Sequence, residues 1–258
     1  MFRHVLPIIL LTAAVAGAEI KREPLDYKHG DLALQGLLVY DDKIDGKRPA
    51  VIVCPEWYGL NDFAKGRAEE LAKLGYVAFA IDPYGKGVTA KSVEEASKMS
   101  GALKADRATL KARVVAGLEA LRNNTHVDPK RIGAIGYCFG GTTALELARS
   151  GADVAGVVSF HGTVGTPTPE DAKNIKGKVL VLHGGADPFV PDSEVADFVE
   201  SMRRHTVNYQ LNIYGGAVHS FTNPNAEKAG LKGVAYDEQA DRRSWAEMKI
   251  FFEEIFRR

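Results

Sequence analysis

The chain of 258 residues is 45% hydrophobic and 26% charged, and its 33 Lys and Arg side chains balance its 33 Asp and Glu side chains. This ordinary globular composition excludes intrinsic disorder and collagen-like repetition, and the lack of a basic excess argues against nucleic acid or an anionic membrane as a partner. Two cysteines are too few for a disulfide scaffold or a zinc cluster, and a chain of this length buries a sufficient core without either.

The first residues have the pattern of a secretory signal peptide. Arg3 precedes an apolar run from Val5 to Val15, and the small residues Ala16-Gly17-Ala18 follow it. The run of about 11 residues is well short of the roughly 20 that span a bilayer, so a retained anchor is the weaker alternative. We expect residues 1–18 to be cleaved after Ala18 and residues 19–258 to form the mature domain. The protein is then periplasmic or secreted, without stable membrane insertion.

The rest of the chain alternates short apolar runs with longer amphipathic segments. This alternation is typical of strand-helix-strand units around a largely parallel sheet. The expected strands are Leu32–Tyr40, Ala50–Cys54, Tyr76–Ile81, Ile132–Gly136, Val154–Phe160, Val179–His183 and Val207–Tyr214. Several of these runs are continuously apolar, as expected of strands covered on both faces. Because the sequence shows no internal repeat and no domain-boundary linker, we expect one doubly wound α/β domain.

Helices are expected between these strands. Asn61 or Asp62 is a candidate N-cap for a helix that ends before Gly75. Further helices are expected at Thr109–Leu121, Gly141–Ala148, Val195–Arg204 and Ser244–Phe256. The stretch Lys86–Lys104 is polar and contains Gly and Ser, so we interpret it as a mobile flap over one end of the sheet.

Cys138 stands at the centre of a glycine-rich turn between an expected strand and an expected helix. The turn reads Gly136-Tyr137-Cys138-Phe139-Gly140-Gly141, with glycine two residues before and two after the cysteine. A Cβ at either flanking position would collide with adjoining backbone, so the pattern is typical of a nucleophile elbow, with cysteine where serine is usual. The helix start favours a thiolate, and the Phe139 N–H is in position to bind an oxyanion. A buried structural cysteine is the alternative interpretation of this motif alone.

An acid and a histidine follow the elbow, each beyond a different expected strand. Asp187 lies in the turn His-Gly-Gly-Ala-Asp-Pro-Phe-Val-Pro, and His219 lies in Gly-Ala-Val-His-Ser-Phe. Nucleophile, acid and base in this chain order are typical of α/β-hydrolases. We therefore expect an α/β-hydrolase fold in which Cys138, Asp187 and His219 form a catalytic triad.

These three motifs resemble those of the dienelactone hydrolase family, over most of the mature chain. A fourth segment, Pro-Glu-Trp-Tyr-Gly-Leu-Asn, is similar to the family's Pro-Glu-x-x-Gly-x-Asn stretch. The resemblance implies an α/β-hydrolase in which Glu56 holds the resting thiol and helps to set its protonation. It also implies that the Trp57 N–H completes an oxyanion hole with the Phe139 N–H.

The expected reaction follows from these roles. His219, oriented by Asp187, keeps Cys138 as a thiolate, which attacks an ester or lactone carbonyl to form a thioester acyl-enzyme. Water activated by His219 then releases the acyl group. A tetrahedral intermediate expels a thiolate more readily than an unprotonated amine, which argues against peptidase activity. We expect a hydrolase of small esters or lactones that uses neither cofactor nor metal.

One position departs from the family pattern. The dienelactone-cleaving members hold the substrate carboxylate with two arginines, and one of them stands where this chain has Asn223; Arg107 is the candidate for the other. A neutral amide offers no charge-assisted fork, so a chlorocatechol-type dienelactone is not the expected substrate. The aromatic residues expected to line the acyl or aryl site are Trp57, Tyr58, Tyr84, Tyr137, Phe160 and Phe221.

Other reactive side chains receive no catalytic role. Cys54 ends the expected strand beside that of Cys138, so a disulfide or redox switch between the two thiols is a minor alternative. His161 and His183 lie at strand ends without carboxylate or thiol partners at metal-ligand spacing, and no metal site is expected. Ser159 lacks glycines on both sides and is not the expected nucleophile.

Other functions are compatible with the same residues. An acyltransferase would use the same cysteine and pass the acyl group to an acceptor other than water. A non-catalytic ligand-binding module would keep the pocket and lose turnover, although the complete set of nucleophile, acid and base argues against such decay. A thiol redox protein is disfavoured because the chain has no C-x-x-C motif.

Overall fold

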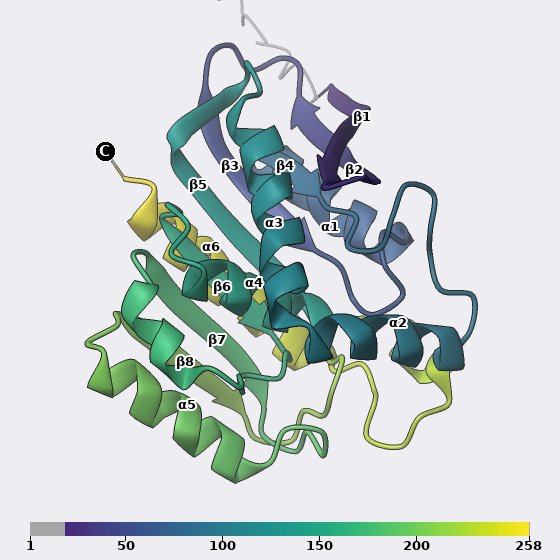
Figure 1. The fold of residues 1–258 in the computed structure, drawn as a ribbon, viewed down its shortest axis with the longest axis vertical. Coiled ribbons are helices and arrows are strands. Elements are labelled where there is room, and N and C mark those ends of the chain that lie inside the picture. The colour runs from purple at the N-terminus through teal and green to yellow at the C-terminus, as the bar shows by residue number, and fades with distance from the viewer. Residues whose placement is uncertain (1–18, 258) are drawn as a thin grey trace, which may run out of the picture.

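The computed structural model describes residues 19–257, and the expected signal peptide lies outside them. One sheet of eight strands runs through the domain in the order β1-β2-β4-β3-β5-β6-β7-β8. The strands are β1 (Ile20–His29), β2 (Leu32–Asp41), β3 (Arg48–Cys54), β4 (Val77–Ala80), β5 (Val127–Tyr137), β6 (Gly156–Phe160), β7 (Lys178–Gly184) and β8 (Tyr209–Tyr214). The two pairings of β2 are antiparallel, and all pairings from β4 to β8 are parallel (Figure 1). This confirms the mostly parallel α/β-hydrolase arrangement predicted from the sequence.

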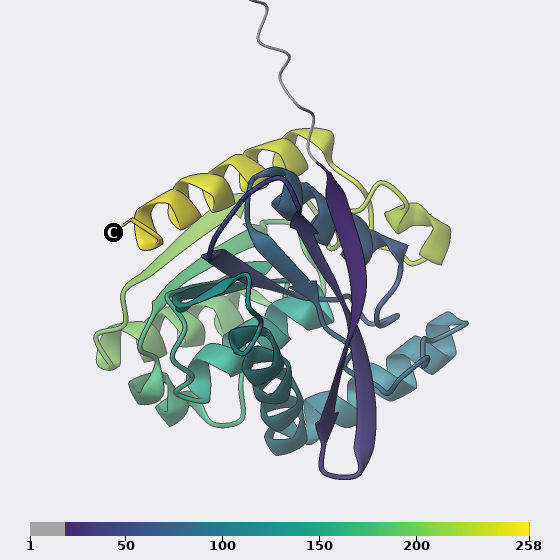
Figure 2. The same cartoon turned by 90° about the horizontal axis from the view of Figure 1, so that it is seen from above.

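Helices cover both faces of this sheet. They are α1 (Asp62–Lys73), α2 (Val93–Ala105), α3 (Arg107–Arg122), α4 (Phe139–Arg149), α5 (Asp192–Arg204) and α6 (Glu238–Ile255), with short 3-10 helices at Pro169–Asn174 and Ala226–Ala229. Helices α3, α4 and α5 pack on one face, and α1 and α6 pack on the other (Figure 2). In β3, Ile52 belongs to the first of these two cores and Val53 to the second. Burial on both faces explains the continuously apolar strands.

Strand β1 is missing from the sequence prediction. It pairs only with β2 at the edge of the sheet, and most of its side chains are exposed or half-buried. Pro24 interrupts its pattern, and an edge strand tolerates a proline because one row of its N–H groups is unpaired. A polar edge strand carries little hydrophobic periodicity, so the first strand with a clear sequence signal is β2.

The stretch Lys86–Lys104, which the sequence predicts to be a mobile flap, contains all but the last residue of helix α2. Ser92 caps this helix by accepting a hydrogen bond from the Glu95 N–H at 3.1 Å. Serine followed three residues later by glutamate is a helix-start signal that the sequence does contain. Leu103 of α2 packs against the apolar cluster beside the elbow. The segment therefore forms a helical wall at the carboxyl end of the sheet.

The other helices begin near their expected positions. Asn61 caps α1 through a 3.1 Å bond from the Ala64 N–H, which decides between the two candidate caps. Helix α6 starts six residues earlier than expected, after the cap Asp237. In residues 19–257 no helix combines the length and the apolar character needed to cross a bilayer.

Candidate active site

Cys138 lies in the sharp turn between β5 and α4, at the N-cap of the helix. Its φ of 55° is in the left-handed region, which residues other than glycine rarely adopt. The backbone N–H of Cys138 donates to the Phe160 carbonyl at 3.0 Å, which ties the turn to the end of β6. Backbone strain of this kind persists where the surrounding structure fixes it, and it is concentrated at functional sites.

The glycines around Cys138 are required by close backbone approaches. A Cβ on Gly136 would lie 1.8 Å from the carbonyl oxygen of Gly140, and one on Gly140 would lie 2.0 Å from that of Cys54. A Cβ on Gly141 would lie 2.5 Å from the Oγ of Ser159. These positions are the crowded ones that the sequence pattern predicts for an elbow.

Three of the predicted site residues meet in a hydrogen-bonded line at the carboxyl end of the sheet. Nε2 of His219 lies 3.0 Å from Sγ of Cys138, and Nδ1 of His219 lies 2.7 Å from Oδ2 of Asp187. Asp187 follows β7 and His219 follows β8, so the three side chains come from the ends of three different strands. His219 and Asp187 are buried, whereas Cys138 is partly exposed.

The charges in this line favour a protonated imidazole. Burial alone would lower the pKa of His219, but its interactions with Cys138 and Asp187 outweigh burial and raise the pKa to about 10. A protonated imidazole can donate a hydrogen bond from Nε2 to the cysteine sulfur and from Nδ1 to the carboxylate.

The loops that carry the acid and the histidine support each other. The Gly185 N–H donates to the Tyr214 carbonyl at 2.8 Å, and the Ala186 N–H donates to the Ala217 carbonyl at 2.9 Å. The backbone of His219 pairs in addition with residues 233–235. Asp187 and His219 are therefore held by backbone contacts as well as by their own hydrogen bond.

Trp57 and Phe139, the residues expected to supply the oxyanion donors, lie on either side of Tyr84. Phe139 is the first residue of α4, where backbone N–H groups have no partner within the helix. Tyr84 donates from Oη to the Trp57 carbonyl at 2.7 Å, and its ring stacks on Phe139 with centroids 6.1 Å apart. One buried tyrosine thus contacts both residues of the expected oxyanion hole.

Glu56 is buried, and its partners differ from the Cys138 thiol that the family resemblance implies. Its carboxylate accepts from Nδ2 of Asn223 at 2.8 Å and from Oγ of Ser220 at 3.4 Å, while Sγ of Cys138 pairs with Nε2 of His219. Burial raises the pKa of Glu56, and the bonds from Asn223 and Ser220 and the nearby cations offset only part of that rise. A role of Glu56 in holding the resting thiol stays a prediction.

A cleft of about 350 Å³ opens over Cys138. The apolar part of its wall includes Trp57, Tyr58, Phe189, Leu231 and Val234. The polar part includes Glu56, Asn61, Ser100, Lys104, Thr163, Ser220, Asn223, Asn225 and Lys228. Polar residues are the more numerous, but more of the exposed surface of the wall is apolar, as in a typical small-molecule site.

Four of the aromatic residues expected to line this cleft do not form its wall. Tyr137, Phe160 and Phe221 are completely buried in the core, and Tyr84 lies behind Trp57 and Phe139. Tyr137 and Phe160 occupy paired positions on β5 and β6 and stack with centroids 4.7 Å apart. They point to the face covered by α1 and α6, so they pack the sheet instead of contacting a ligand.

The two cysteines are both free thiols in the structure. Cys54 is completely buried in the core, and this burial raises the pKa of its thiol. A disulfide or redox switch between Cys54 and Cys138 stays a prediction. Arg107, the candidate for a substrate-binding arginine, is not part of the cleft wall, and the carboxylates that act on its charge are Glu146 and Glu194.

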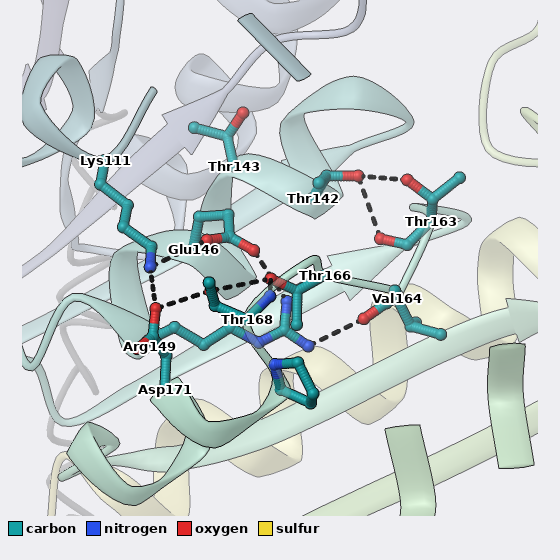
Figure 3. A network of polar contacts seen from close by, with 12 residues as sticks. Lys111, Thr142, Thr143, Glu146, Arg149, Thr163, Val164, Thr166, Thr168 and Asp171 are labelled. Carbon is teal, nitrogen blue, oxygen red and sulfur yellow. Dashed lines mark hydrogen bonds and ion pairs between the residues drawn. The ribbon is translucent and has the colours of Figure 1, made fainter. Parts of the chain in front are cut away.

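A polar network anchors the elbow helix from behind (Figure 3). Glu146 is completely buried and pairs with Arg149 at 3.0 Å and with Lys111, which also binds Asp171. Arg149 donates to the Val164 carbonyl at 2.8 Å. Because Glu146 and Arg149 belong to α4, the network ties this helix to α3 and to the loop that follows β6.

Sequence reasoning missed two neighbours of the triad. Phe189 lies edge-on to the His219 ring with centroids 5.3 Å apart, two residues beyond Asp187 in a motif that the sequence does mark. His161 lies under Cys138, where its Nδ1 accepts from the Cys138 N–H at 3.1 Å, and no sequence signal marks this contact. Across residues 19–257, no group of three or more His, Cys, Asp or Glu side chains is arranged to hold a metal ion.

A family match covers most of the chain. The model of the dienelactone hydrolase family matches residues 34–256. A protein of Bradyrhizobium sp. named "Probable 2-oxo-3-(5-oxofuran-2-ylidene)propanoate lactonase" is 33% identical over 189 residues, which are 69% of this chain and 75% of that protein.

Two solved structures are similar over almost their whole length. A dienelactone hydrolase-like promiscuous phosphotriesterase from metagenomic libraries is 40% identical with a TM-score of 0.89, covering 93% of this chain and 100% of its own. A structure named m3DLH is 42% identical with a TM-score of 0.90, covering 92% of this chain and 99% of its own. With a family match across most of the domain, the α/β-hydrolase sheet and the elbow at its carboxyl end, this chain belongs to the dienelactone hydrolase family and is a hydrolase.

Proposed function

We propose that the protein hydrolyses small carboxylic esters or lactones, with Cys138 as the nucleophile, His219 as the base and Asp187 as the group that orients the imidazole. The observation that carries this proposal is the continuous line from Sγ to Nε2 at 3.0 Å and from Nδ1 to the carboxylate at 2.7 Å, at the base of an apolar cleft.

In the first half of the reaction the thiolate of Cys138 attacks the carbonyl carbon and forms a C–S bond. The Trp57 and Phe139 N–H groups stabilise the oxyanion. The intermediate then expels the alkoxide, which takes the proton from Nε2 of His219, and a thioester remains. The raised pKa of His219 keeps this proton available at neutral pH.

In the second half water attacks the thioester and Nε2 of His219 takes its proton. The second tetrahedral intermediate expels the thiolate and releases the carboxylic acid. Asp187 stabilises the imidazolium in both halves through its bond to Nδ1. The bond between His219 and Cys138 then forms again, so the site returns to its starting ion pair.

The cleft wall supports a small, mainly apolar substrate. Within the described residues the wall contains no arginine, and Asn223 donates to Glu56. The lysines on the wall are Lys104 and Lys228. We therefore propose neutral esters and lactones as substrates in preference to a dienelactone carboxylate that needs an arginine fork.

A phosphotriester is the second candidate substrate class. The similar structure at 40% identity is named a promiscuous phosphotriesterase, and a thiolate beside two backbone donors also suits attack on a neutral P=O group. A phosphotriester therefore belongs in the same substrate panel as the carboxylic esters.

The test compares initial rates for p-nitrophenyl acetate, small lactones and a p-nitrophenyl dialkyl phosphate. Cys138→Ala should lower every rate by at least about 10³-fold. Cys54→Ala is the matched control, because it removes the other thiol from a core position outside the cleft and should leave kcat/KM unchanged. Full activity in Cys138→Ala would overturn the proposal. Transfer of the acyl group to added alcohols in preference to water would favour an acyltransferase, and saturable binding without turnover would favour a binding module.

We also propose that the protein is exported and matured at Glu19. Ile20 opens β1, and the Glu19 N–H donates to Oδ1 of Asp41 at 3.0 Å. Cleavage after Ala18 would leave the new α-amino group beside this carboxylate. N-terminal sequencing of the protein from the periplasm or medium of a Gram-negative host should begin at Glu19. A cytoplasmic protein that keeps residues 1–18 would contradict the proposal.

A further inference from the structure

His161 occupies an unusual position directly after β6. Its side chain is completely buried, and its φ of 41° lies in the left-handed region. A buried histidine with a strained backbone needs a compensating contact, because both features cost free energy. The contact is with the nucleophile turn.

The hydrogen bonds of His161 fix its tautomer. Nδ1 accepts from the Cys138 N–H at 3.1 Å, and Nε2 lies 2.8 Å from Oγ1 of Thr222. Because a backbone N–H can only donate, Nδ1 must be unprotonated, so the proton of the neutral ring is on Nε2 and is donated to Thr222. Burial, followed by the positive charges of His219 and Arg67, holds the pKa of His161 well below its usual value, which agrees with a neutral ring.

Thr222, the partner of Nε2 of His161, is itself connected to two helices. The carbonyl of Thr222 accepts from Arg67 at 2.8 Å, and Arg67 pairs with Asp241 at 2.7 Å. The chain of contacts therefore runs from the elbow through His161 and Thr222 to α1 and α6. It gives the acceptor nitrogen a fixed position beneath the turn.

The same ring also packs against the base of the triad. The rings of His161 and His219 lie edge to face with centroids 5.4 Å apart, and Phe221 contacts His161 in the same manner at 5.1 Å. His161 thus touches two members of the triad, Cys138 through the backbone and His219 through the ring. It does not line the cleft and would not contact a substrate.

We propose that His161 is a positioning residue for hydrolysis, which holds the Cys138 backbone in its left-handed conformation and so aligns the thiolate and the adjacent Phe139 N–H with the substrate carbonyl. This inference rests on the proposed function, because it assumes that Cys138 is the nucleophile. Its physical basis is that the Cys138 N–H has two acceptors, the Phe160 carbonyl at 3.0 Å and Nδ1 of His161 at 3.1 Å. Loss of the second acceptor releases one of the two restraints on a strained turn.

Three substitutions separate the acceptor from the other properties of the side chain. His161→Asn keeps an acceptor at the place of Nδ1 and tolerates a positive φ. His161→Leu has nearly the same shape as Asn and no acceptor. His161→Gly accommodates the backbone conformation without strain and also has no acceptor. Gly tolerates the positive φ but has no acceptor, whereas Asn has both properties. Activity in the Asn variant and not in the Gly variant would therefore be due to the acceptor.

The experiment measures kcat and KM for p-nitrophenyl acetate in the three variants, with Tm for each. We expect kcat to fall about tenfold or more in His161→Leu and His161→Gly with KM within about twofold, and to recover to within about threefold of wild type in His161→Asn. His126→Asn is the control for loss of a histidine, because His126 stacks on Tyr40 before β5 begins, at the opposite end of the sheet. It should leave kcat unchanged.

Wild-type kcat in His161→Gly or His161→Leu would overturn the inference, as would an Asn variant as slow as the Leu variant. Cys138→Ala, measured in parallel, keeps the two proposals distinct. If Cys138→Ala retains full rate, the proposed function fails. If Cys138→Ala is inactive and every His161 variant turns over like wild type, only the positioning role fails.

Discussion

The approach of Gly140 to the backbone of β3 allows a sharp test of the elbow. In Gly140→Ala the added Cβ would lie 2.0 Å from the carbonyl oxygen of Cys54 and 2.6 Å from that of Pro55. Both contacts are with backbone, which cannot rotate away as a side chain can. Helix α4 must therefore move away from β3 by about 1 Å, since Cβ atoms are not found within about 3 Å of such oxygens.

The displacement acts on the site because Gly140 is the second residue of α4. Cys138 and the Phe139 N–H belong to the same turn, so they move with it. A misplacement of about 1 Å costs on the order of 10²-fold in rate, and overpacking costs about 1–3 kcal/mol of folding free energy. We expect kcat/KM to fall about 100-fold and Tm to fall by about 2–10 °C in a domain of this size.

Gly66→Ala is the matched control for this change. Gly66 lies inside α1, and a Cβ there would meet nothing within 4 Å. Alanine should stabilise the helix by about 0.5–1 kcal/mol and leave kcat/KM unchanged. The assays are thermal unfolding followed by circular dichroism and initial rates for p-nitrophenyl acetate. A Gly140→Ala protein with wild-type kcat/KM and Tm would refute the steric account of the elbow.

Three further predictions concern the charges and contacts at the site. The proposed ion pair predicts that Cys138→Ala lowers the pKa of His219 from about 10 in an NMR titration of the ring, and an unchanged pKa would contradict the ion pair. The pKa of His219 in the folded protein lies above its ordinary value of 6.5. Its contribution to stability is therefore complete below about pH 6.5 and is lost as the pH rises through about 10. Urea unfolding across this pH range should show a smaller loss of stability in Cys138→Ala than in wild type. Tyr84→Phe keeps the ring stacked on Phe139 and removes the hydrogen bond to the Trp57 carbonyl. We expect kcat to fall about three- to tenfold with KM nearly constant. A fall in Tm with unchanged kcat would show that the bond stabilises the fold and has no role in turnover.

The parts of the fold that could be predicted are those with a local signal. Continuously apolar strands and the glycines around Cys138 report burial and close approach directly, so the core strands and the elbow follow from the sequence. Strand β1 has no such signal, since its edge position leaves it polar. Helix α2 has a local signal in the Ser92–Glu95 pair, whereas its polar composition is more typical of a loop.

The orientation of the aromatic residues could not be predicted for a different reason. Tyr137 adjoins the nucleophile in sequence, yet it belongs to the strand, and its side chain points to the face under α1 and α6. Its partner Phe160 is fixed by strand register, which a single sequence does not contain. Proximity to a motif therefore predicts which end of the sheet a residue occupies, whereas the alternation of the strand decides whether it meets ligand or core.

Cys138 and His161 both have a strained backbone, but only Cys138 is marked by a sequence pattern. In residues 19–257 only four residues other than glycine have a positive φ, and three of them lie in or beside the proposed triad: Cys138, His161 and Ser220. Cys138 is flanked by glycines because its neighbours approach other backbone closely, and those glycines are visible in the sequence. The strain at His161 is compensated by the N–H of a residue 23 positions away, and that at Ser220 accompanies a bond to a carboxylate 164 positions away. Long-range compensation leaves no local signature, so the residues that hold this site in place become apparent only when the chain is folded.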